Sequence, residues 1–474
     1  MGSIKKNLIY NIFYQLLVIL IPLITTPYIS RVLGANKIGV YSYAYSIAYY
    51  FVLFIMLGLN NYGNRTIASI RDDKYKRSKN FIGIYLMQLI TGLVCNILYI
   101  FYCFFISKNT TISLALGLYV FSGIFDINWF FFGMEKFKLT VIRNTIIKII
   151  TTACIFIFVK SSEDILIYSI ILSLGTLISQ VVLWSYLPKY IYPVKIKIDD
   201  ILIHIKPNLY LFLTVIGVSL YKTMDKIMLG YMCPKQQLGF YESAEKIINI
   251  PIAMVTSLGT VMLPRMTNLK SKKDDKTFNK YMENSIIFAM FSSSIMCFGI
   301  MGVSKIFIPL FYGEGFETCI DLYLILLPSC LFLAFGNVIR TQFILPNKMD
   351  KIYIISAFVG AIINMVLNLI LIPKFYAVGA AIGTLFAEAS VCIYQMVKVK
   401  KYLPIKKYLR KSFIFIVIGI IMFVILFNTN LIIDNKLLML LANILYGGII
   451  YFSLLLIGLL GRKMIRKILH NSIS

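Results

Sequence analysis

The chain has 474 residues, of which 59% are hydrophobic and only 14% are charged. This composition excludes a soluble globular protein, which needs a charged surface. The net charge of +27 would suggest a nucleic-acid partner for a soluble protein, but here basic residues alternate with apolar segments, so no nucleic acid is predicted. Eight scattered cysteines lack the spacing of a metal or disulfide site. We therefore expect an all-α membrane protein without a metal site or bound cofactor.

Fourteen apolar segments follow one another along the chain. Their lengths are near the roughly 20 residues that a membrane-spanning helix needs. They cover residues 10–30, 39–60, 81–106, 112–133, 140–159, 165–187, 209–230, 239–263, 284–311, 321–345, 352–373, 376–397, 412–428 and 437–460. The polar segments between them are short. The pattern predicts a polytopic protein of fourteen transmembrane helices with little room for a soluble domain.

The distribution of basic residues predicts the orientation. With the N-terminus in the cytoplasm, about 34 Lys and Arg residues fall on the inner side and about 7 on the outer side. Short loops rich in Lys and Arg stay cytoplasmic. We expect both termini to lie in the cytoplasm, and attraction to anionic membrane lipids accounts for most of the basic clusters.

An internal repeat appears at an offset of 200 residues. Residues 39–47 (GVYSYAYSI) and 239–247 (GFYESAEKI) share the pattern GxYxxAxxI. A duplication would give two pseudo-symmetric six-helix lobes plus two additional helices, and transporters built from such repeats bind substrate between the halves. The predicted divisions are a first lobe over 1–189, a cytoplasmic linker over 190–206, a second lobe over 207–400, and the last two helices with a cytoplasmic tail over 401–474.

Ionisable residues inside apolar segments are costly, so they usually pair, face the protein interior or line a path. Lys222, Asp225 and Lys226 share one helix face, and the same spacing recurs in Glu242, Glu245 and Lys246. Both triplets lie at similar depth, so we expect them to meet. Two interpretations stay open: an ion-pair network that locks two helices together, or groups that bind an anionic substrate or a coupling ion.

Further charges lie in other segments. Asp126 and Lys148 stand at equal distances from the loop between their helices, which predicts a structural ion pair across that hairpin. Arg340 either extends to the cytoplasmic interface or faces a cavity, where its planar donors would suit a diphosphate. Arg31 is a weaker candidate of the same kind. Tyrosines near the outer ends fit an interfacial belt, although rings along a cavity would also suit sugars.

Several motifs resemble those of Wzx-type polysaccharide repeat-unit flippases, which belong to the multidrug, oligosaccharidyl-lipid and polysaccharide exporter superfamily. The resemblance covers essentially the whole chain and is strongest at the end of the fourth apolar segment. The motifs are PYISRVLG (27–34), NRTIA (64–68), DINWFFFGMEKF (126–137), DKIMLG (225–230), YESAEKI (241–247) and VMLPR (261–265).

The resemblance implies translocation of an undecaprenyl-diphosphate-linked oligosaccharide across a bacterial inner membrane. It also allows H+ or Na+ coupling and a polysaccharide polymerase as a partner. On this basis the expected cationic substrate-binding residues are Arg340, Lys222, Lys226 and Arg31. The expected charge-balancing or ion-coupling residues are Asp225, Glu242, Glu245 and Lys246.

Two alternatives within the superfamily are a lipid II flippase and a multidrug or cation antiporter. A drug exporter should have an acid-rich cavity and usually twelve helices, whereas basic residues and fourteen segments are found here. A membrane enzyme is a different class. The chain has only two histidines, neither in the core of an apolar segment, so no histidine-based acid and base pair is predicted in the membrane.

Overall fold

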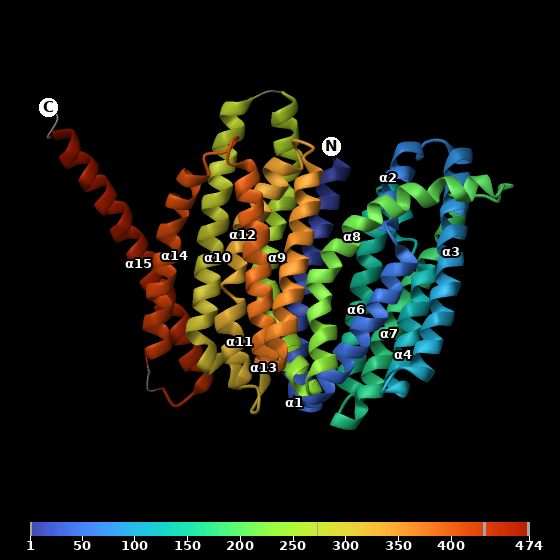
Figure 1. Cartoon of the computed structure of the whole chain (residues 1–474), viewed down its shortest axis with the longest axis horizontal. Coiled ribbons are helices and arrows are strands. Elements are labelled where there is room, and N and C mark those ends of the chain that lie inside the picture. The colour runs from blue at the N-terminus through green and yellow to red at the C-terminus, as the bar shows by residue number, and fades with distance from the viewer. Residues whose placement is uncertain (1, 273, 430–432, 472–474) are drawn as a thin grey trace. The chain divides into compact units, whose positions relative to one another are not determined.

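The computed structural model describes the backbone of residues 2–272, 274–429 and 433–471, and the side chains of residues 20–213, 215–220, 222–272, 274–429 and 433–458. Every regular element in this part of the chain is a helix (Figure 1). The described residues contain twelve helical stretches long and apolar enough to cross a membrane. Helices suit this environment because they satisfy their backbone hydrogen bonds internally. The predicted all-α fold is confirmed.

Two compact units, Met1–Glu242 and Ser243–Ser474, divide the chain. The first contains α1 (Gly2–Met56), α2 (Leu59–Ile70), α3 (Lys74–Phe105), α4 (Thr110–Ser122), η1 (Gly123–Phe125), α5 (Asn128–Gly133), α6 (Phe137–Phe158), η2 (Ser162–Asp164), α7 (Ile165–Trp184), η3 (Leu187–Lys189), α8 (Asp199–Met232) and the start of α9 (Lys235–Ser271). The second contains the rest of α9, then α10 (Asp275–Tyr312), α11 (Thr318–Leu326), α12 (Ser329–Ile339), η4 (Arg340–Ile344), α13 (Asp350–Val399), α14 (Ile405–Asn428) and α15 (Lys436–Asn471). The division of the sequence into lobes at 189, 206 and 400 stays a prediction.

Helix α13 is a hairpin of two helices. Fifty residues of straight helix would extend about 75 Å, far more than the about 30 Å of a hydrocarbon core. The chain reverses at Tyr376, whose φ of 52° and ψ of −127° are not helical. The amide of Gln395 donates to the hydroxyl of Ser356 over 2.9 Å, although 39 residues separate them, so the two halves run side by side in opposite directions.

Helix α1 is interrupted in the same way at Gly34, which has a φ of 69° and a ψ of 168°. The positive φ costs glycine little because it has no Cβ. In Figure 1 the chain descends from N to the label α1 and then rises toward α2. Dividing α1 and α13 at their interruptions supports the expected total of fourteen crossings, and the number of crossings in a bilayer stays a prediction.

The fourth apolar segment, predicted over 112–133, matches one membrane-spanning stretch, Thr110–Gly133, but its helix is broken. Helix α4 ends at Ser122, and α5 begins at Asn128 after a single turn of 3-10 helix. The buried amide of Gln88 donates to the carbonyl oxygens of Gly123 at 2.8 Å and Asp126 at 3.0 Å. A break in membrane-buried backbone needs such partners. Gln88 therefore satisfies the carbonyls that the break releases.

An aromatic core surrounds this break. The indole nitrogen of Trp129 donates to the carbonyl oxygen of the Gln88 side chain over 3.1 Å. Trp129, Phe130 and Phe131 are fully buried and pack with Phe81. The aromatic residues of the 126–137 motif thus form the core that fixes α5 against α3.

Helix α1 and the start of α9 approach each other closely in the first unit. A Cβ on Gly39 would lie 1.7 Å from the carbonyl oxygen of Lys235, and a Cβ on Gly239 would lie 1.8 Å from that of Ala35. Small residues four apart allow backbones to approach in this way. Gly39 faces Lys235, and Ala35 faces Gly239. Each of the two contacts therefore corresponds to the other when the chain is shifted by the 200 residues of the repeat.

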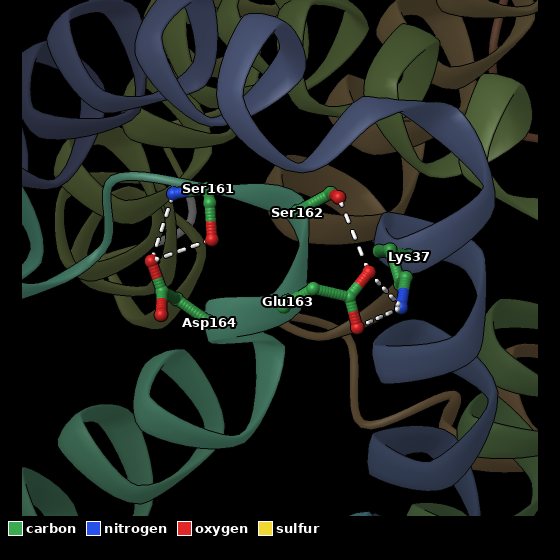
Figure 2. A network of polar contacts seen from close by, with 5 residues as sticks. All are labelled: Lys37, Ser161, Ser162, Glu163 and Asp164. Carbon is green, nitrogen blue, oxygen red and sulfur yellow. Dashed lines mark hydrogen bonds and ion pairs between the residues drawn. The ribbon is translucent and has the colours of Figure 1, made fainter.

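A polar network fixes the chain just after the interruption in α1. The ammonium of Lys37 forms an ion pair with Glu163, 3.2 Å from Oε1, as Figure 2 shows. The neighbouring Asp164 accepts hydrogen bonds from the backbone nitrogen and hydroxyl of Ser161, at 2.8 and 3.0 Å. This arrangement caps η2 and ties α1 to the turn between α6 and α7.

We predict that Gly39→Ala destabilises the protein by about 3 kcal/mol or more, the upper end of overpacking costs, because the new methyl group would overlap backbone atoms. Thermal unfolding of the purified protein in detergent measures this. The matched control is Gly117→Ala, whose Cβ would meet only the ring of Tyr99 at 3.7 Å. Equal unfolding temperatures for the two variants would show that the close approach is not required.

Candidate functional site

A charged cluster joins α8 and the start of α9. The ammonium of Lys226 lies 2.8 Å from Oε2 of Glu242, and both side chains keep about a fifth of their surface exposed, 18% and 19%. The hydroxyl of Ser42 on α1 donates to the same carboxylate over 2.9 Å. The two predicted triplets therefore meet at the ion pair of Lys226 and Glu242, which is neither fully buried nor fully solvated.

The second acid of this region lies deeper. Asp225 is 2% exposed and accepts a hydrogen bond from the hydroxyl of Tyr241, with 2.9 Å between the oxygens. A carboxylate in such a position needs polar partners. Lys222, one turn away on α8, is exposed instead. One face of α8 thus holds an exposed cation, a buried acid and a partly exposed ion pair.

Tyrosine rings extend from this cluster. The ring centroids of Tyr41 and Tyr45 are 5.8 Å apart, and those of Tyr45 and Tyr119 are 5.1 Å apart, both stacked. Tyr168 meets Tyr41 edge-on at 4.9 Å. Tyr45 keeps 37% of its surface exposed although rings flank it on two sides. This row of rings, next to Ser42 and Glu242, presents both aromatic faces and hydroxyl groups.

Arg31 and Arg340 lie in different units. Arg31 is exposed and donates from Nη1 to the carbonyl oxygen of Pro27 over 3.1 Å. Arg340 is half-buried, donates from Nη2 to Oδ1 of Asn337 over 2.6 Å, and has its guanidinium carbon 5.4 Å from the ring centre of Tyr353. The substrate-binding role expected for Arg31 and Arg340 stays a prediction.

The segment that holds Arg340 is irregular. Residues Arg340–Ile344 form a π-helical turn, a feature frequent at functional sites. The apolar segment predicted over 321–345 matches one stretch long and apolar enough to span a membrane, and it consists of α11, α12 and this turn. Glu245 and Lys246 lie half-buried on the part of α9 in the second unit, and their predicted coupling role stays a prediction.

A second polar cluster lies among α5, α6 and α7. Oδ1 of Asp126 accepts hydrogen bonds from the backbone nitrogen and side-chain amide of Asn128, at 3.0 and 2.7 Å. The same amide donates to Gln180 over 2.9 Å. The ion pair expected between Asp126 and Lys148 stays a prediction. Lys148 lines a pocket of about 270 Å³ that Asn128 and Gln180 also line.

The sequence interpretation missed Arg143. This side chain is 6% exposed and donates to the carbonyl oxygen of Ser179 over 2.7 Å and to the amide oxygens of Asn128 and Asn144 over 3.0 and 2.7 Å. Its place near the start of a predicted helix suggested an interfacial position. The amides at 128 and 144 were the available signal, since a membrane-buried cation needs polar partners.

These groups can bind ligands through hydrogen bonds and charge. Among the described side chains, no group of three His, Cys, Asp or Glu residues could hold a metal ion. The clusters offer ammonium, guanidinium, amide and phenol groups at membrane depth. Such groups suit phosphate and sugar hydroxyls through hydrogen bonding.

Comparison with known families agrees with this chemistry. A family model described as polysaccharide biosynthesis protein matches residues 4–270, more than half of the chain. The chain belongs to this family. A second family model, MatE, matches residues 211–370. Together they confirm the resemblance to the exporter superfamily that includes Wzx-type flippases.

The relatives and structural neighbours of this chain are distant from it in sequence. A protein of Escherichia coli strain K12 whose name assigns it to O-antigen transport is 21% identical over 82% of this chain and 95% of its own length. A protein of Haloferax volcanii named as a low-salt glycan biosynthesis flippase is 24% identical over 52% of each chain. The structure of the lipid II flippase MurJ in an inward closed conformation has a TM-score of 0.78 at 17% identity, covering 97% of this chain and 100% of that chain, which shows a shared fold.

We predict that Glu242→Gln lowers the stability of this family member by about 1–3 kcal/mol, less than for a fully buried pair because both side chains are partly solvated. The double variant Lys226→Met/Glu242→Gln should recover most of that loss, since no unpaired charge remains. Thermal unfolding measures both. The control pair Lys37→Met/Glu163→Gln, exposed at 33% and 81%, should change stability little.

The same variants distinguish an ion pair that only holds two helices together from one that lies on the transport path. If the ion pair only locks two helices, the stable double variant transports normally. If the pair belongs to the transport path, the double variant is folded but inactive. A double variant no more stable than Glu242→Gln would contradict the ion-pair interpretation itself.

Proposed function

We propose that this protein is a flippase that moves an undecaprenyl-diphosphate-linked oligosaccharide from the cytoplasmic to the outer face of a bacterial inner membrane. It would act by alternating access of two six-helix lobes, with two further helices outside the repeat. The product would supply a surface polysaccharide such as O-antigen, capsule or exopolysaccharide. Its fourteen helices would leave both termini in the cytoplasm, as the distribution of Lys and Arg indicates.

One observation carries this proposal: the ion pair of Lys226 and Glu242 lies next to a row of stacked tyrosines in a membrane-spanning unit. Cations bind phosphate groups through charge-assisted hydrogen bonds, and the amphipathic rings of tyrosine combine an apolar face with a hydroxyl. A lipid-linked oligosaccharide has both a diphosphate and sugar rings. The names of the relatives in Escherichia coli and Haloferax volcanii support the same substrate class.

The roles proposed for the charged residues are those expected from the sequence. Arg340, Lys222, Lys226 and Arg31 would contact the diphosphate at different stages of transport. Asp225, Glu242, Glu245 and Lys246 would balance these charges or couple transport to an H+ or Na+ gradient. A polysaccharide polymerase would use the translocated product.

We expect Lys222→Ala and Arg340→Ala each to lower export of surface polysaccharide at least about tenfold, the effect of losing one hydrogen bond to a charged group. Export is measured in cells that carry equal amounts of each variant in the membrane. Lys401→Ala, an exposed cation in the predicted cytoplasmic loop after α13, serves as the matched control. Normal export by both test variants would remove the cationic-site proposal.

A lipid II flippase is the second candidate, because the structure of one shares the fold over nearly the full length. Complementation separates the two functions. The protein should restore surface polysaccharide to a strain that lacks its repeat-unit flippase, and should not restore growth to a strain depleted of its lipid II flippase. The reverse result would assign the protein to peptidoglycan synthesis.

A further inference from the structure

A pocket of about 640 Å³ lies between α6 and the end of α7, within the volume range of about 300–1,000 Å³ that is typical of ligand sites. Its walls are apolar: Leu139, Ile142, Ile146, Ile147 and Val182. Ile142 and Ile146 are 40% and 50% exposed. Side chains of this kind on a spanning helix face lipid, so the pocket opens to the membrane from the side of the first unit.

Basic residues surround the end of this pocket nearest the turn between α5 and α6. Lys136 and Lys138 are exposed there. The acid at the same end, Glu135, forms an ion pair with Arg71 at 2.6 Å, which neutralises its charge. The end of the pocket is therefore positive, and the distribution of Lys and Arg predicts that it faces the cytoplasm.

Arg143 forms the polar floor. It lines this pocket and also the pocket of about 270 Å³ that contains Asn144 and Gln180. Its hydrogen bonds to Ser179, Asn128 and Asn144 hold the guanidinium in place. A buried cation thus lies beneath the apolar walls, and two exposed lysines, Lys136 and Lys138, lie at the mouth.

We propose that this pocket binds one anionic phospholipid of the inner leaflet. Its phosphate lies at Lys136 and Lys138, and an acyl chain lies along Ile142 and Ile146. Charge complementarity supports this occupant, because lysines near a membrane surface attract anionic lipids and long lysine side chains reach the headgroup level. The site is separate from the cluster at Lys226 and does not depend on the proposed transport function.

The test is native mass spectrometry of the full chain in detergent, titrated with phosphatidylglycerol or with phosphatidylcholine of the same acyl chains. We expect phosphatidylglycerol to bind more tightly. Lys136→Gln/Lys138→Gln should weaken its binding about thirtyfold, as expected for the loss of two cations that each contribute about 1 kcal/mol beside an anionic lipid. The matched control Lys400→Gln/Lys401→Gln removes two exposed cations elsewhere and should bind normally.

A second variant tests the apolar wall. Ile146→Trp fills the pocket and should abolish retention of the lipid, whereas Ile149→Trp changes an equally exposed residue, 53% against 50%, that does not line the pocket. Equal affinity for the two lipids would overturn charge recognition at this site. Equal losses in the test and control variants would show general adsorption of lipid and overturn the proposal.

Discussion

The arrangement of the first unit depends on the close approach of α1 and the start of α9. Gly39 and Gly239 each meet the opposite backbone at a distance that admits no Cβ. One turn further along both helices, Ser42 and Glu242 meet in a hydrogen bond of 2.9 Å. The carboxylate that pairs with Lys226 is therefore positioned by two residues without side chains, and the charged cluster would change wherever that approach is lost.

In the first unit, side-chain amides satisfy both the break after α4 and the charges of Asp126 and Arg143. Gln88 accepts from Trp129 and donates to the carbonyls at the end of α4. Asn128 links Asp126 to Gln180, and Arg143 reaches the same asparagine. Amides suit this position because each both donates and accepts without carrying charge. These networks hold the irregular backbone in place where water is not available to satisfy it.

Much of the architecture could be predicted because the lengths of the apolar segments and the charges of the loops are local properties of the sequence. The helical fold and the meeting of Lys226 with Glu242 both followed from spacing along the chain. The break before Asn128 could not be predicted, because its stability depends on Gln88, a residue 40 positions earlier. Arg143 was missed because, apart from its neighbour Asn144, its partners lie on other helices, Asn128 on α5 and Ser179 on α7.

The ion pair of Lys226 and Glu242 is partly exposed, and stability of the fold and the proposed transport function make different demands on such a pair. A pair that only stabilised the fold would gain little over apolar residues of similar size, because desolvation offsets most of the attraction. Lys226 and Glu242 are instead left about a fifth exposed and next to tyrosine hydroxyls. In the proposed function, such a pair would exchange partners at low cost when a phosphate binds, because the carboxylate would keep Ser42 as a donor while the ammonium turned to the ligand. That retained hydrogen bond is the feature by which the proposed transport site would differ from a pair that only locks two helices.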